Sequence, residues 1–150
     1  MNLKSEIIKN HPFVKNHLEE YSDLVSSTFE NSKIFLYILK KYNEYPTLKN
    51  KLNFYTDYDI SDIVGEDREE EFAIEYKLNE NRFVFGMGVI YLVNDYDIKA
   101  EPVILNIWDI SQKNYSVEEI LDVIFNEKLS TEEKIEKIKK YEEEIYYKNE

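Results

Sequence analysis

The stretch Phe83-Val84-Phe85-Gly86-Met87-Gly88-Val89-Ile90-Tyr91-Leu92-Val93 decides the fold of this chain. Its 11 residues form the longest apolar run in the sequence. A helix that spans a bilayer needs about 20 such residues, so the run indicates a buried element of a globular protein. A strand that is apolar on both faces is central and covered on both sides. We therefore expect one strand over residues 82–93, with Gly86 and Gly88 on one face, where a helix approaches closely.

Two more strands are predicted beside this one. Residues 71–78 alternate apolar and polar side chains, as in a half-exposed strand, and Asn79-Glu80-Asn81 forms a tight turn. A further strand covers roughly residues 98–110 and carries Trp108 near its end. Short turns between the three strands predict an antiparallel meander. Residues 47–56 show no clear pattern.

Helices are predicted on both sides of the meander. Apolar residues recur at three- and four-residue steps over 13–29 and 32–42. Ser116 to Glu119 and Ser130 to Glu133 each match a capping box, which predicts the starts of two C-terminal helices. The expected fold is a single α+β domain over residues 1–150, with N-terminal helices, a three-stranded antiparallel β-meander and two C-terminal helices.

Composition excludes several kinds of protein. The chain has 150 residues, 31 acidic against 19 basic, and a formal net charge of -12. No cysteine is present, which excludes a disulfide scaffold and a thiolate metal site. A protein that coats nucleic acid needs a basic surface, so direct nucleic-acid binding is not expected. The histidines, His11 and His17, do not have the spacing of a metal pair on one helix face, and we expect neither metal nor cofactor.

The source and compartment are also indicated by composition. Ile, Lys, Asn and Tyr, whose codons are AT-rich, are abundant, which indicates a low-GC bacterium or its phage. The N-terminal residues lack the apolar segment of a secretory signal. We expect a cytoplasmic protein that does not contact membranes.

The negative charge is concentrated in one segment. Residues 57–71 hold eight acids against Arg68, a net charge of -7, and the mutual repulsion predicts a solvated loop. Tyrosines beside dense carboxylates are typical of a surface that associates quickly and salt-sensitively with a basic partner. The alternative is a solvated loop with core-packing tyrosines. The candidate partner contacts are Tyr55, Asp57, Tyr58, Asp59, Asp62, Glu66 and Asp67, followed by Asp95, Tyr96 and Asp97.

Two other functions stay open. Glu75-Tyr76-Lys77 resembles the core of PD-(D/E)xK nucleases, in which two acids hold a divalent metal and the lysine stabilises charge. Asp62 or Asp67 would be the upstream acid, although the Pro-Asp pair is missing. The structural alternative is a solvent-facing cross-strand charge pair. A homo-oligomeric structural protein, in which a second copy covers the apolar strand, is the other candidate.

A limited resemblance concerns the order of elements. Leu39-Lys40-Lys41-Tyr42-Asn43 ahead of the meander, then Trp108 and the helix over 116–125, is similar to the SUKH-type bacterial toxin-immunity proteins. Glu44 stands where that family has glycine. The resemblance implies a protein that neutralises a toxin, often a nuclease.

The sequence favours a small, acidic, non-enzymatic inhibitor. We expect it to bind and block a basic nucleic-acid-handling protein such as a nuclease, as a phage anti-defence protein (an anti-CRISPR, for example) or as a toxin-immunity protein. A homodimer is compatible with this function.

Overall fold

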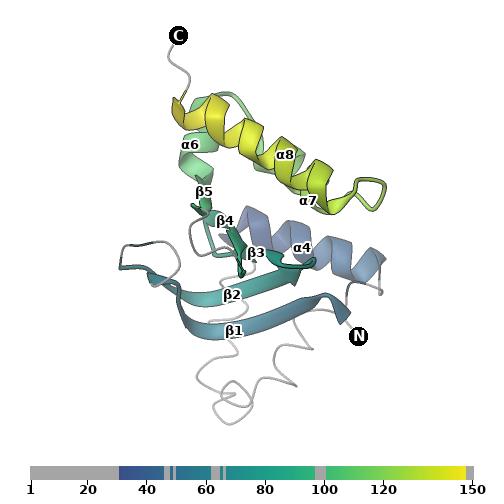
Figure 1. Cartoon of the computed structure of the whole chain (residues 1–150). Coiled ribbons are helices and arrows are strands. Elements are labelled where there is room, and N and C mark those ends of the chain that lie inside the picture. The colour runs from purple at the N-terminus through teal and green to yellow at the C-terminus, as the bar shows by residue number, and fades with distance from the viewer. Residues whose placement is uncertain are drawn as a thin grey trace.

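The computed structural model describes residues 31–45, 48, 50–61, 65, 67–96 and 101–147, and of Thr56 and Asp57 only the backbone. Figure 1 shows one sheet with helices gathered on one side of it. In chain order the elements are α4 (Lys33–Glu44), β1 (Leu52–Asp59), β2 (Glu69–Lys77), β3 (Asn81–Phe85), β4 (Val89–Asn94), β5 (Val103–Asn106), α6 (Ile107–Gln112), α7 (Val117–Ile124), α8 (Thr131–Glu142) and the π-helical turn η2 (Glu143–Tyr147). Mixed α and β structure is thereby confirmed.

The five described strands form one antiparallel sheet in the order β1-β2-β3-β4-β5. The sheet is antiparallel as predicted, but the predicted three-stranded meander is wrong. One additional strand, β1, lies largely in the segment whose sequence showed no clear pattern. The other arises because the long apolar run is divided.

The predicted single strand over 82–93 is wrong, because the chain turns back at Gly86-Met87-Gly88. The Gly86 N–H donates to the Val89 carbonyl at 2.9 Å, and Phe85 pairs with Ile90 across the turn. Alternation of apolar residues does not distinguish one long strand from two short ones. Folding the run on itself pairs its backbone groups and places Phe85 and Ile90 in the same core.

The predicted strand over 98–110 is also too long. Within its described part only Val103–Asn106 is extended, and the next six residues form α6. Trp108 therefore lies on a short helix, where 69% of its surface is exposed.

The helix starts agree with the sequence. Ser32 caps α4 by accepting a hydrogen bond from the Phe35 N–H at 3.2 Å. Both capping boxes, at Ser116 and Ser130, are complete, so the predicted starts of α7 and α8 are confirmed. The predicted number of two C-terminal helices is wrong, because α6 precedes α7 and η2 follows α8. The helices predicted before residue 31 lie outside the described residues.

The main core lies between the sheet and helices α4, α7 and α8 (Figure 1). Aromatic rings stack there: Phe125 lies 5.0 Å from Tyr76 and 5.7 Å from Phe85, centroid to centroid. The other face of the sheet is buried too, with Val84 and Tyr91 at 0% exposure. The centre of β2 is buried on both faces, so the prediction of a half-exposed strand is wrong for that segment. Burial on both faces of β3 and β4 is as predicted.

Candidate partner-binding surface

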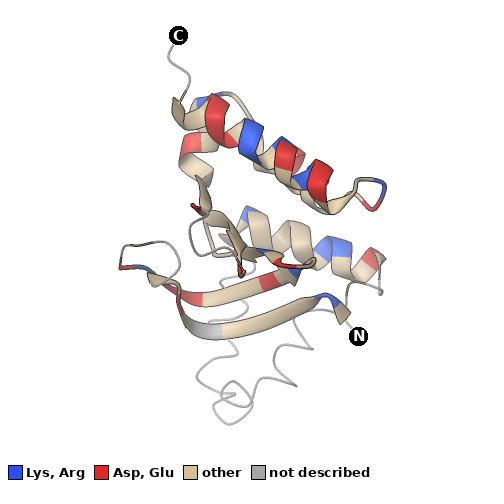
Figure 2. Cartoon of the chain, viewed as in Figure 1, with Lys and Arg blue, Asp and Glu red and all other residues tan. Residues whose placement is uncertain are grey.

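The carboxylates of the acidic segment are placed largely by strand pairing rather than by a loop. Asp59 ends β1 and pairs directly with Glu69 at the start of β2. Figure 2 shows acidic residues where β2 begins. The exposed described carboxylates of this hairpin are Asp59, Asp67, Glu69 and Glu71, and we call them the acidic hairpin end. The prediction of a solvated loop over residues 57–71 is wrong at both ends, because residues 57–59 belong to β1 and residues 69–71 belong to β2.

This arrangement brings negative charges close together. Like charges directly opposite each other on neighbouring strands destabilise a sheet. Hydrogen bonds from Ser61, whose N–H lies 2.9 Å from Asp59 Oδ1, hold the pKa of the Asp59 carboxyl below its ordinary value. Asp59 is therefore charged at neutral pH beside Glu69. The pair of Asp59 and Glu69 does not stabilise the fold, but its negative charge can attract a basic partner.

Glu70 differs from its neighbours because its carboxylate turns toward the sheet. The Tyr91 hydroxyl donates to Glu70 Oε1 at 2.9 Å. Burial, together with this bond, raises the pKa of Tyr91 to about 12, against the opposing effect of Arg68. The carboxyl of Glu70 also lies against Gly86: a Cβ at Gly86 would be 2.4 Å from Glu70 Cδ. Gly86 thus accommodates a carboxylate, not the helix that the sequence suggested.

Arg82 joins two groups of predicted contact residues. Its guanidinium donates to the Tyr58 hydroxyl at 2.7 Å and to Asp95 Oδ1 at 3.0 Å. The Tyr55 ring packs on Tyr58 at 5.0 Å between centroids, and both side chains are half-buried. Tyr55 and Tyr58 are therefore only partly available for contact with a partner. Tyr96, by contrast, is 82% exposed.

The remaining predicted contacts are only partly described. Asp57 lies on β1, and its side chain is outside the described structure. Asp62, Glu66 and Asp97 lie outside the described residues.

In the nuclease-like motif, the acidic residue Glu75 pairs with the guanidinium of Arg82. Glu75 is 7% exposed, and its Oε2 lies 2.7 Å from Arg82 Nη1, while Asn53 Nδ2 donates to its Oε1 at 3.2 Å. Lys77 is exposed. The sequence suggested a charge pair facing solvent, whereas Glu75 forms a largely buried ion pair, and its partner is Arg82 rather than Lys77. In the described part of the chain no group of three or more acids and histidines is placed to hold a metal ion.

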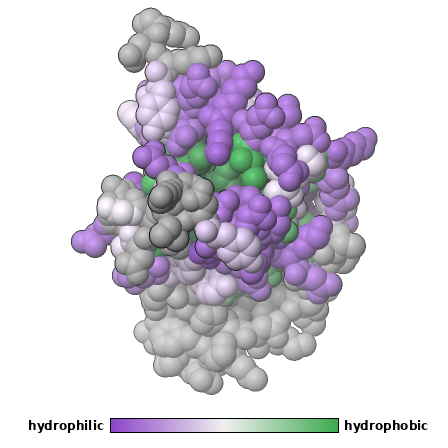
Figure 3. All heavy atoms as spheres, viewed as in Figure 1, coloured by the Kyte–Doolittle hydropathy of each residue, from purple (hydrophilic) through white to green (hydrophobic). Residues whose placement is uncertain are grey.

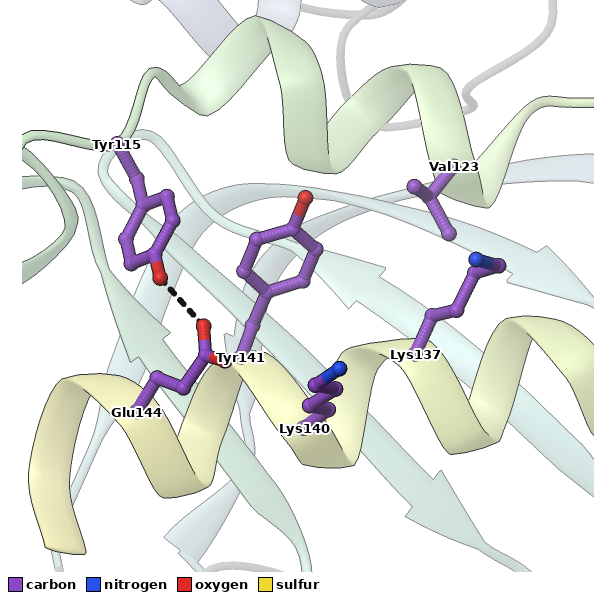
Figure 4. A pocket seen from close by; sticks show the side chains of 6 residues that line it. All are labelled: Tyr115, Val123, Lys137, Lys140, Tyr141 and Glu144. Carbon is purple, nitrogen blue, oxygen red and sulfur yellow. Dashed lines mark hydrogen bonds between the residues drawn. The ribbon is translucent and has the colours of Figure 1, made fainter. Parts of the chain in front are cut away.

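A pocket of about 240 Å³ opens between α7 and α8 (Figure 4). Tyr115 and Tyr141 meet edge to face at 5.3 Å, and the Tyr115 hydroxyl donates to Glu144. That bond raises the pKa of Tyr115 to about 12. Figure 4 shows Lys137 and Lys140 on the side of Tyr141 away from Tyr115. The lining combines tyrosine rings with lysine and glutamate side chains, so it offers both apolar and charged binding contacts.

Exposed apolar side chains are the part of the surface that sequence reasoning missed. Trp108 and Met87 are 69% and 45% exposed, although the sequence suggested a strand for each. Figure 3 shows hydrophilic side chains over most of the described surface on one side of the molecule, around an apolar area beneath α8. None of the helices in the described ranges has both the length and the apolar character that crossing a membrane requires.

Comparison with known proteins leaves the chain without a family assignment. No protein-family model, no curated protein and no solved structure matches it. The resemblance to SUKH-type immunity proteins, and the function that it implies, stay predictions from the sequence.

Proposed function

We propose that this chain is a small, non-enzymatic inhibitor that binds a basic nucleic-acid-handling protein and blocks it. The observation that carries the proposal is the acidic hairpin end, where Asp59 and Glu69 face each other across two strands while both are exposed. Such a pair costs stability in the free protein. A cationic partner would relieve the repulsion on binding, and the charge would speed association.

Hydrogen bonds also order the side chains at the acidic hairpin end and around it. Arg82 ties β1 to the end of β4 through Tyr58 and Asp95, and Ser61 fixes the Asp59 carboxylate. A charged surface that is already ordered loses little conformational entropy when it binds. Carboxylates on ordered strands then present fixed negative charges, as nucleic-acid phosphates do. Phage anti-defence and toxin immunity are the two biological settings in which such an inhibitor would act.

The test is a pull-down from a low-GC bacterial lysate with the tagged chain as bait, followed by an inhibition assay on each captured protein. The bait is compared with a triple variant, Asp59→Lys/Asp67→Lys/Glu69→Lys. A matched control, Glu118→Lys/Glu132→Lys/Glu136→Lys, changes the net charge equally at exposed helix positions. We expect capture of a basic nuclease or nucleic-acid-binding protein whose activity the wild-type chain blocks. Binding should weaken between about 0.1 M and 1 M salt, as the Debye length falls from about 10 Å to 3 Å.

The control determines how the result is read. Loss of capture by the hairpin variant alone supports a specific site at the hairpin end. Equal loss by both variants would mean that only net charge matters. A captured protein that keeps its full activity in the presence of the chain would contradict the function of inhibitor.

The nuclease alternative gains no support from the described residues, because Glu75 is paired with Arg82. A Mg²⁺-dependent nicking assay on plasmid DNA, with Lys77→Ala as the inactive control, checks it directly. Cleavage by the wild-type chain and not by the variant would replace the inhibitor proposal.

A further inference from the structure

Two large apolar side chains are exposed on connected elements, Trp108 on α6 and Met87 in the turn between β3 and β4. Trp108, the single tryptophan of the chain, is 69% exposed, and Met87 is 45% exposed. Tryptophan is among the residues most often found to dominate binding energy at protein interfaces. In a free monomer an exposed tryptophan contributes little to burial, so its position calls for an explanation in terms of binding.

Hydrogen bonds to the backbone join the elements that carry these two residues. The Ile107 N–H donates to the Gly88 carbonyl at 3.0 Å, which joins the start of α6 to the β3–β4 turn. The Ser32 hydroxyl donates to the Met87 carbonyl at 2.6 Å, which fixes that turn to the start of α4. Because Trp108 follows Ile107 and Met87 precedes Gly88, the first bond keeps the backbones of Trp108 and Met87 near each other.

Tyr146 contacts the first turn of α6. Its hydroxyl accepts a hydrogen bond from the Asn106 N–H at 3.1 Å and donates to Asp109 Oδ2 at 2.7 Å. Tyr146 lies in η2, a π-helical turn, and such turns occur frequently at functional sites. Trp108 lies between the two residues that Tyr146 contacts. These contacts, like the bond from Ile107 to Gly88, hold the N-terminal half of α6 before any partner arrives.

A carboxylate of β2 lies beside the β3–β4 turn. Gly86 precedes Met87 and lies against the carboxyl of Glu70, which is the neighbour of Glu69 and Glu71. The Glu70 carboxylate therefore lies beside the turn that carries Met87. A guanidinium group suits this combination, because it stacks on aromatic rings and also pairs with carboxylates.

We infer that Trp108 and Met87 form the apolar anchor of the partner-binding surface, and that their occupant is an arginine-bearing segment of the basic partner. This inference rests on the proposed function and names the chemistry of its partner. The arginine stem packs on Met87, its guanidinium lies over the Trp108 ring, and the hairpin carboxylates attract the neighbouring cations. Lysine fits less well, because its compact, strongly hydrated ammonium does not stack as a planar group does.

Trp108 makes the test direct, since the fluorescence of a single tryptophan reports on that position alone. The probes are two dye-labelled, acetylated peptides, one alternating arginine with glycine and one alternating lysine with glycine. Their affinity for the full chain is measured by fluorescence polarisation at about 0.15 M salt. Unlabelled peptides then serve for acrylamide quenching of Trp108. The variants are Trp108→Ala and, as a matched exposed aromatic on another element, Tyr45→Ala.

We expect the arginine peptide to bind more tightly than the lysine peptide and to protect Trp108 from acrylamide. Trp108→Ala should weaken arginine binding by about two- to fivefold, the size of an exposed cation–π contact, and Tyr45→Ala should leave it unchanged. Binding of the arginine peptide without protection of Trp108 would overturn this inference and leave the acidic inhibitor in place. Absence of salt-sensitive binding by both peptides would overturn the inference and count against the proposed function.

Discussion

The ion pair between Arg82 and Glu75 provides the sharpest test of how this sheet is stabilised. The perturbation is Arg82→Met, which keeps the length of the side chain and removes its charge. The Arg82 guanidinium contacts Glu75 Oε2 at 2.7 Å, the Tyr58 hydroxyl at 2.7 Å and Asp95 Oδ1 at 3.0 Å. The side chains of Arg82 and Glu75 are 15% and 9% exposed, whereas that of Asp95 is 32% exposed. Most of the effect should therefore come from Glu75.

The expected loss is about 3 kcal/mol in the free energy of unfolding. Removing one partner of a buried ion pair costs about 3–5 kcal/mol, because the other charge is left without compensation. Asn53 still donates to Glu75 at 3.2 Å, which places the value at the lower end. The more exposed contact with Asp95 adds less than about 1 kcal/mol. Replacing both partners, as Arg82→Met/Glu75→Gln, should recover most of the loss, since no charge is then stranded.

The assay is urea unfolding followed by circular dichroism, with the slope of the transition checked for constancy. Lys77→Met is the matched control: Lys77 pairs with Arg82 across the strands but is exposed, so its loss should cost less than about 0.5 kcal/mol. If Arg82→Met also costs less than about 1 kcal/mol, solvent reaches Glu75 and the pair behaves as a surface pair. If the double variant is no more stable than Arg82→Met, the cost does not come from a stranded Glu75 charge.

Three further outcomes are expected. Gly86→Ala should destabilise the chain by about 1–3 kcal/mol in urea unfolding, because the new Cβ displaces the Glu70 carboxylate from the Tyr91 hydroxyl. In the double variant with Glu70→Ala the steric part of this loss should disappear. If the losses of the two single variants simply add in the double variant, this account is refuted. Ser130→Ala should cost about 1 kcal/mol by removing a helix cap, and an unchanged transition midpoint would contradict the role of the capping box. Raising the pKa of Tyr91 from 10.0 to about 12 adds stability that is complete below pH 10 and is lost as pH rises toward 12. Melting temperatures of the wild type and Tyr91→Phe should therefore converge over that interval, and a constant difference would argue against the shift.

Local features of the fold could be predicted because their causes are local. A capping box needs only a serine and a glutamate three residues apart, and both were found where the sequence placed them. The burial of both faces of the central strands also followed from composition, since an uninterrupted apolar run has no polar face to give to water. The acidic character of the candidate surface is likewise a property of the sequence.

The position of the acidic residues could not be predicted, because it depends on strand pairing. Repulsion within the acidic segment indicated a loop, yet the register of β1 against β2 places Asp59 opposite Glu69. Trp108 was expected on a strand for a similar reason: its apolar neighbours fit either a strand or a short helix. The hydrogen bonds of Tyr146, from a distant part of the chain, support the helix.

The sequence by itself determined the class of the fold, the starts of the C-terminal helices, the doubly buried strands and the net negative charge. Each depends on composition or on residues within one turn or one strand. Only the tertiary structure decided that the apolar run folds into a hairpin at Gly86, that Arg82 pairs with Glu75, and that Trp108 is exposed on a short helix joined to that hairpin. These outcomes depend on which distant segments pair, and pairing is selected by the free energy of the whole sheet.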